Sequence, residues 1–134
     1  MNPTPILQKG LPNRFYATME EFFRERELIF SSMWISIGFA SEAPNAGDTC
    51  PLEFMELPLL ILRGEDLKLR VFHNVCPHRG HILVSESQNL KKNLRCPYHS
   101  WTFHLDGQLV HTPHIGGVGV RELKTFDLSC HGMR

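Results

Sequence analysis

The sequence has 134 residues, of which 42% are hydrophobic, and this suits one compact domain with an apolar core. Lys plus Arg and Asp plus Glu number 14 each, so the formal net charge is zero and the basic excess typical of nucleic-acid-binding domains is missing. The N-terminus lacks the basic start and apolar run of a secretory signal, and no apolar stretch is long enough to span a bilayer. We therefore expect a cytoplasmic protein that binds neither nucleic acid nor membrane.

The chain begins with an arm and a helix. Residues 1–14 contain three prolines and no periodicity, which predicts an extended arm. Residues 15–33 are predicted to be helical, because Thr18 and Glu21 have the spacing of a capping box. Apolar side chains recur on one face of this helix, and we interpret them as core packing: Met19, Phe22, Phe23, Phe30 and Met33.

Short β-like runs replace the helical pattern after Trp34. The connection Arg63–Asp66 indicates one hairpin, and Asp106-Gly107, a strong two-residue turn signal, indicates another. Gly116–Gly119 predicts a flexible loop. The strands expected are 34–39, 50–57, 59–62, 67–72, 93–95, 101–105 and 108–111.

Two short motifs present thiols and imidazoles at the ends of predicted strands. They are Cys76-Pro77-His78 and Cys96-Pro97-Tyr98-His99, separated by the 17 residues from Arg79 to Arg95. Each proline stiffens its loop and cannot donate to a ladder. Two cysteines and two histidines, one of each per loop, match the ligand set of a Rieske [2Fe–2S] cluster, in which two histidines hold one iron and two cysteines the other.

Other interpretations of these residues stay open at this point. Structural zinc also accepts two cysteines and two histidines, although its ligands usually come as Cys–Cys and His–His pairs. Packed cysteines and hydrogen-bonded histidines are a further alternative. Cys50 and Cys130 have no ligand-like context and are interpreted as free thiols. His111 and His114 have a metal-like spacing but are not needed as ligands.

The two motifs, Cys76-Pro77-His78-Arg79-Gly80 and Cys96-Pro97-Tyr98-His99-Ser100-Trp101, with Leu105-Asp106-Gly107 after them, resemble the Rieske domain of ring-hydroxylating-type oxygenase α subunits. The resemblance covers nearly the whole chain. It implies a mainly β fold: a Rieske-type antiparallel β-sandwich with a small cluster-binding subdomain over residues 34–127, preceded by the helix. Residues 128–134 are then a tail toward a catalytic domain. Ser100 replaces the glycine of most members, as in subunits acting on quaternary ammonium compounds.

The resemblance also implies a function. Cys76, His78, Cys96 and His99 would hold the cluster, and the edge of His78 or His99 would face the electron acceptor. The donor would be a ferredoxin or a flavin- and NAD(P)H-dependent reductase. The acceptor would be the mononuclear iron of a neighbouring subunit in a homotrimer that oxidises an aromatic ring or a quaternary ammonium compound. Arg79 would offset cluster charge, and Trp101 would shield the cluster from water.

Two features refine the expected role. No Asp/Glu-x-x-His-x(3–4)-His pattern for a mononuclear iron occurs, so we expect no hydroxylation from these residues alone. His81 and Tyr98 occupy the positions of the disulfide of the cytochrome bc branch, which predicts a midpoint potential at the low end of the Rieske range. We therefore expect the N-terminal part of an oxygenase subunit. A free-standing Rieske ferredoxin and a zinc-binding module are the alternatives.

Overall fold

The computed structural model describes residues 10–30 and 32–113, which divide into a helical unit up to Ile35 and a β unit from Ser36 onward. The helical unit contains α1 (Arg14–Ala17), α2 (Met19–Glu25) and a π-helical turn, η1 (Arg26–Phe30). Thr18 lies between the two α-helices with extended backbone, and its Oγ1 accepts a hydrogen bond from the backbone N–H of Glu21 at 3.4 Å. The expected single helix is thus interrupted at the residue that caps its second part.

The apolar stripe of the helical unit is not core. None of the described residues of α1, α2 and η1 is buried, and Met19 and Met33 are each more than half exposed. The interpretation of this face as core packing is wrong for the structure described. No helix in the described part of the chain combines the length and apolarity needed to cross a bilayer.

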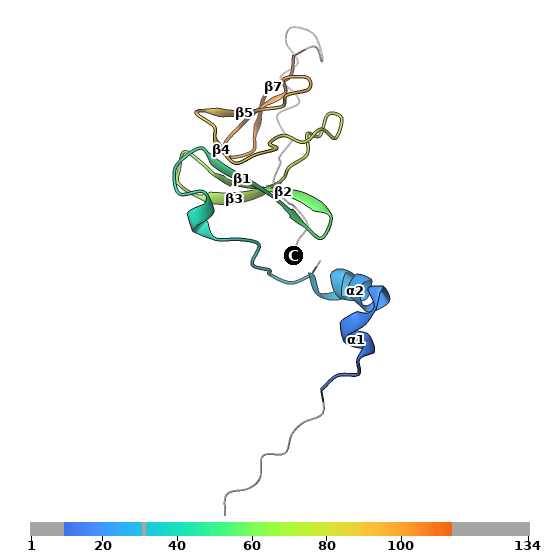
Figure 1. Cartoon of the computed structure of the whole chain (residues 1–134). Coiled ribbons are helices and arrows are strands. Elements are labelled where there is room, and N and C mark those ends of the chain that lie inside the picture. The colour runs from blue at the N-terminus through green and yellow to red at the C-terminus, as the bar shows by residue number, and fades with distance from the viewer. Residues whose placement is uncertain (1–9, 31, 114–134) are drawn as a thin grey trace, which may run out of the picture. The chain divides into compact units, whose positions relative to one another are not determined.

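The β unit is built from two antiparallel sheets (Figure 1). One has four strands in the order β3-β2-β1-β4, and the other has three in the order β5-β6-β7. A short 3₁₀ helix, η2 (Ala40–Glu42), precedes the first strand. The strands are β1 (Asp48–Phe54), β2 (Leu57–Arg63), β3 (Leu69–His73), β4 (Gln88–Asn89), β5 (Asn93–Arg95), β6 (Thr102–His104) and β7 (Leu109–His111).

One apolar core joins the two sheets. Leu60 and Phe72 pair across β2 and β3, and both are almost completely buried. Leu94 of β5 and Phe103 of β6 pair in the other sheet and belong to the same cluster. Burial of such side chains stabilises the fold by about 1.5–3 kcal/mol each. Because Cys76 and Cys96 are also members of this cluster, the core positions both candidate metal loops directly.

The expected mainly β fold and both expected hairpins are confirmed. The β6–β7 turn places Gly107 at φ 94°, as its Asp-Gly sequence indicates. The predicted strand over residues 34–39 is wrong, because these residues form no strand and Trp34 is 99% exposed. The outer edge of β1 pairs instead with the two-residue strand β4.

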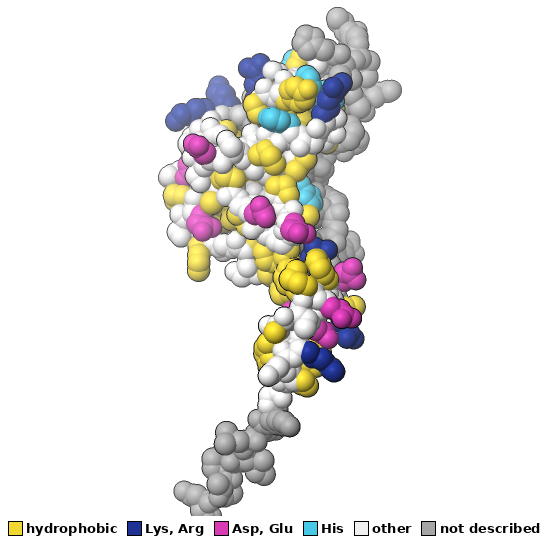
Figure 2. All heavy atoms as spheres, turned by 45° about the vertical axis from the view of Figure 1, so that its right-hand side comes forward, with side chains coloured by type: hydrophobic (Ala, Val, Ile, Leu, Met, Phe, Trp, Pro, Cys, Tyr) yellow, Lys and Arg dark blue, Asp and Glu magenta, His cyan; other side chains and the backbone are white. Residues whose placement is uncertain are grey.

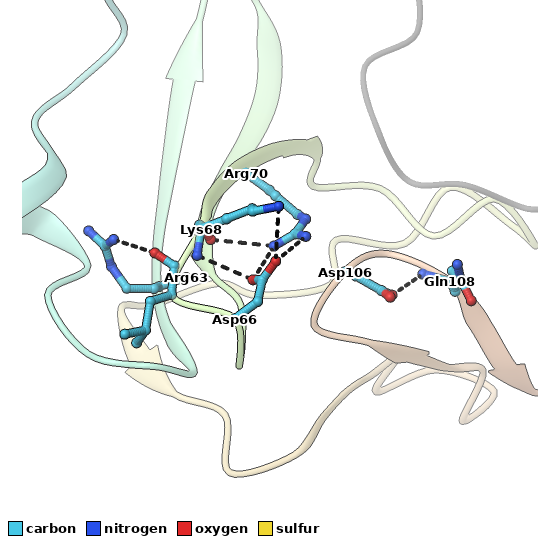
Figure 3. Close-up of polar contacts among 7 residues, drawn as sticks. Arg63, Asp66, Lys68, Arg70, Asp106 and Gln108 are labelled. Carbon is cyan, nitrogen blue, oxygen red and sulfur yellow. Dashed lines mark hydrogen bonds and ion pairs between the residues drawn. The ribbon is translucent and has the colours of Figure 1, made fainter.

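Charged side chains fix the β2–β3 hairpin (Figure 3). The carboxylate of Asp66 accepts two hydrogen bonds from the guanidinium of Arg70, at 2.8 and 2.9 Å, and these hold the pKa of Asp66 well below its usual range. Arg63 donates to the carbonyl oxygens of Leu67 at 2.8 Å and Ala40 at 2.9 Å. The hairpin and η2 are therefore tied together at the end of β2.

Candidate metal centre

The first candidate loop is a closed turn that begins at Cys76. The backbone N–H of Gly80 donates to the carbonyl of Cys76 at 2.9 Å, and the N–H of Cys76 donates to the carbonyl of His81 at 2.8 Å. Gly80 adopts φ 68°, the left-handed conformation that glycine reaches without steric cost. A bridge between Val75 and Ile82 closes the base of the loop.

The second loop repeats this hydrogen-bond pattern at the same offsets. The N–H of Ser100 donates to the carbonyl of Cys96 at 3.0 Å, and the N–H of Cys96 donates to the carbonyl of Trp101 at 2.8 Å. Ser100 has φ 61°, so it occupies the position that Gly80 occupies in the first loop. Two copies of one turn geometry therefore present the two Cys/His pairs.

The sulfur side of the site is buried. Cys76 and Cys96 are each 2% exposed, and burial raises the pKa of the Cys76 thiol, with the neighbouring Cys96 thiol raising it further. Ionising the Cys76 thiol in this buried position is therefore costly without a compensating cation. A metal ion would supply that compensation, because thiolates are metal ligands.

The imidazole side of the site is half-buried. The rings of His78 and His99 lie with their centroids 4.7 Å apart, and the Nδ1 atoms of both rings are buried. The Nδ1 of His78 has no hydrogen-bond partner among the described residues. A buried imidazole nitrogen without a hydrogen-bond partner is the arrangement expected of a metal ligand. In Figure 2, histidine and hydrophobic side chains gather at the upper end of the β unit.

Aromatic side chains connect the two loops. The indole of Trp101, in the second loop, stacks on the imidazole of His78, in the first, with an interplanar angle of 3° and centroids 4.9 Å apart. The ring centroid of Tyr98 lies 3.7 Å from that of His99 and 5.5 Å from that of His81. The two positions that would carry the disulfide of the cytochrome bc branch are thus neighbours here, joined by ring contact.

Sequence reasoning missed the residue that holds the base of the first loop. The side chain of Asn74, 3% exposed, donates to the carbonyl of Val84 at 2.7 Å and accepts from the N–H of Val84 at 3.0 Å. The side-chain amide of Asn74 therefore hydrogen-bonds both the N–H and the carbonyl of the buried Val84. An asparagine between a strand and a cysteine motif was the only signal, and it also fits an ordinary turn.

The remaining sequence candidates lie elsewhere. Cys50 is half-buried in β1, whereas His114, the loop Gly116–Gly119 and Cys130 lie outside the described residues. Within the described ranges, no group of three or more His, Cys, Asp or Glu side chains is arranged to hold one metal ion. Zinc needs four ligands around one ion, whereas a Rieske cluster assigns one pair to each iron.

Comparison with known families gives a match over most of the chain. Residues 33–127 match the model of the Rieske [2Fe–2S] domain. The carnitine monooxygenase oxygenase subunit of Escherichia coli K12 is 44% identical over 108 residues, which are 81% of this chain and 29% of that protein. The glycine betaine monooxygenase oxygenase subunit of Chromohalobacter salexigens is 34% identical over 125 residues, 93% of this chain and 27% of that protein. The chain thus spans less than a third of the length of these relatives.

Solved structures show the same fold. The quaternary ammonium Rieske monooxygenase CntA, in complex with L-carnitine, superposes with a TM-score of 0.78 at 37% identity, over 88% of this chain and 34% of that chain. Naphthalene 1,2-dioxygenase with bound indole gives a TM-score of 0.73 at 30% identity, over 86% and 26% of the two chains. The chain therefore belongs to the Rieske [2Fe–2S] domain family, in the branch formed by the oxygenase subunits of Rieske oxygenases, and its cofactor is a Rieske-type [2Fe–2S] cluster.

Proposed function

We propose that Cys76 and Cys96 bind one iron through Sγ, that His78 and His99 bind the other through Nδ1, and that this domain carries single electrons. The observation that carries the proposal is the pair of matching loops, which bring two buried thiols and two buried Nδ1 atoms to one end of the core. A Rieske cluster, when bound, accepts and releases one electron at a time at a potential that its surroundings set.

The two ligand pairs differ in exposure, and this difference indicates through which ligands electrons leave the cluster. The cysteines are almost inaccessible, whereas both histidines are half-exposed at the surface of the β unit. Electrons therefore have their shortest route to a partner through the imidazole edges. The stacked indole of Trp101 covers one face of His78, fixes the plane of that ring and excludes water from it.

We further propose that the domain serves an oxygenase that acts on a quaternary ammonium compound such as carnitine or glycine betaine. The support is the identity of 44% to the carnitine subunit, and the identity on superposition of 37% to CntA against 30% to naphthalene 1,2-dioxygenase. The donor would be a ferredoxin or a flavin- and NAD(P)H-dependent reductase. The acceptor would be a mononuclear non-haem iron held in a cytoplasmic homotrimer. One solved relative was described in terms of carnitine oxidation and inter-subunit electron transfer.

The ligand assignment is tested by single substitutions with matched controls. We expect Cys76→Ser and His78→Ala to abolish the Rieske signal in electron paramagnetic resonance and to lower iron and acid-labile sulfide together. Cys50→Ser and His81→Ala remove the same chemical groups from residues outside the proposed ligand set, and we expect both to keep the signal. A ligand variant that retained the signal would contradict the assignment, and a colourless protein containing stoichiometric zinc would contradict the cofactor.

The proposed oxygenase role is tested with this domain joined to the catalytic domain of a carnitine monooxygenase oxygenase subunit. With a reductase and NAD(P)H, we expect oxygen-dependent oxidation of carnitine or glycine betaine, and we expect His99→Ala to abolish it. Reduction of the domain without oxidation of any quaternary ammonium compound would favour a free-standing electron carrier instead.

A further inference from the structure

Ser100 is held in a conformation that is unfavourable for serine. Its φ of 61° is in the left-handed region, where any residue with a Cβ is strained and glycine is not. Gly80 fills the equivalent position of the first loop at φ 68°, so this turn works with glycine. A strained residue kept where glycine fits is a reason to look for a role of its side chain.

The side chain of Ser100 has a specific partner. Nη2 of Arg95 donates a hydrogen bond to Oγ of Ser100 at 2.8 Å. The backbone of Ser100 is bonded as well, because its N–H donates to Cys96 and its carbonyl accepts from Oγ1 of Thr102 at 3.0 Å. Every polar group of this serine is therefore bonded, and the hydroxyl is the one that glycine would lack.

This hydrogen bond fixes a positive charge beside the proposed ligands. Arg95 directly precedes Cys96 and Ser100 directly follows His99, so the guanidinium closes the loop that carries both. Arg95 belongs to β5, whose pairing with Thr102 fixes its backbone. Without Ser100, the long arginine side chain would extend into water, where its charge is more strongly screened.

We propose that Arg95 and Ser100 act as a pair that positions a cation to raise the reduction potential of the cluster; this rests on the proposed ligation by Cys96 and His99. Two ferric ions, two sulfides and two thiolates sum to zero charge, and one-electron reduction leaves the centre at minus one. A fixed guanidinium stabilises the reduced form more than the oxidised form. Arg95 is exposed to solvent, so the effect is modest, about threefold in the equilibrium constant for reduction, or about 30 mV for a one-electron couple.

The test is a redox titration of the cluster-loaded protein, followed by visible circular dichroism. We expect Arg95→Gln to lower the reduction equilibrium constant about threefold. Ser100→Gly keeps the charge, removes the anchor and relieves the φ strain, so we expect a smaller decrease with no loss of cluster. Arg95→Lys keeps a positive charge, so we expect it to lower the reduction potential less than Arg95→Gln does. Lys92→Gln removes one exposed charge before the same loop, and we expect it to change the potential much less than Arg95→Gln.

The double variant Arg95→Gln/Ser100→Gly separates a coupled pair from two independent residues. If Ser100 acts by holding Arg95, the double variant has the potential of Arg95→Gln alone, because the two changes are not additive. Additive shifts, or unchanged potentials in variants that keep a Rieske resonance signal, would overturn this inference and leave the proposed function standing. Absence of a Rieske signal in the unmodified protein would overturn both.

Discussion

Replacing Asn74 with alanine should be among the most damaging single changes in the β unit. The amide of Asn74 is 3% exposed and bonds both the N–H and the carbonyl of Val84, which is itself 1% exposed. Alanine leaves these two backbone groups buried without those partners, and each such group costs about 1–3 kcal/mol. The expected loss in the free energy of unfolding is about 2–6 kcal/mol, a large share of the about 5–15 kcal/mol typical of a domain.

The measurement is urea unfolding of the cluster-loaded protein without oxygen, followed by far-ultraviolet circular dichroism. With a denaturant slope of about 2 kcal/mol per molar, the urea midpoint should fall by about 1–3 M. Asn74→Asp keeps an acceptor for the N–H of Val84 but has no donor for its carbonyl. We expect it to be at least as damaging, because it also buries a carboxylate.

Asn89→Ala is the matched control. Asn89 also makes two hydrogen bonds, to the carbonyl of Ala46 at 2.9 Å and to Oδ1 of Asp48 at 2.7 Å, but it is exposed. Water replaces its amide, so we expect a loss below about 1 kcal/mol. Equal midpoints for Asn74→Ala and Asn89→Ala would refute the argument that burial of the Val84 backbone makes Asn74 important.

Three further predictions concern the loop, the core and the hairpin. Gly80→Ala has open space for its Cβ but must adopt φ 68°, so we expect a loss of about 1–2 kcal/mol in the free energy of unfolding; an unchanged urea midpoint would contradict this. Phe103→Ala, at 0% exposure, should cost about 3–5 kcal/mol and accelerate cluster loss, measured as bleaching of the visible band; a wild-type bleaching rate would show that the core does not hold the loops. The pKa of Asp66 is lowered on folding by Arg70, so its ion pair stabilises the protein above the unfolded pKa of about 3.9, and this is lost as pH falls through the folded pKa. Asp66→Asn should therefore be less stable than the wild type at pH 7 and converge with it in acid; a stability difference independent of pH would contradict the assignment.

The metal loops and hairpins were predictable because their signals are local. Proline after each cysteine and the strand-like runs before them indicate loops at strand ends, and Asp106-Gly107 specifies a tight turn. The turn between β1 and β2 was not predictable. It uses Met55 at φ 50° and Glu56 at φ 66°, residues that do not favour this conformation and are held there by pairing of the flanking strands.

Contacts between segments that are distant in the sequence were also not predictable. The strand β4 has two residues and exists because Thr49 of β1 bonds Gln88, 39 positions away, through its hydroxyl. Residues 34–39 have strand-like composition but no neighbour to pair with in the described structure, and a strand is defined by its partner. The stack of Trp101 on His78 likewise depends on tertiary structure, which the motif alone does not specify.

The central claim is that one thiolate pair and one imidazole pair divide the two irons between them. Pulsed electron paramagnetic resonance of the reduced protein, grown with ¹⁵N-labelled histidine, tests it most directly. We predict couplings from two histidine nitrogens, and we expect both to be kept in His81→Ala. Couplings from one histidine or none, or a loss caused by His81→Ala, would contradict it.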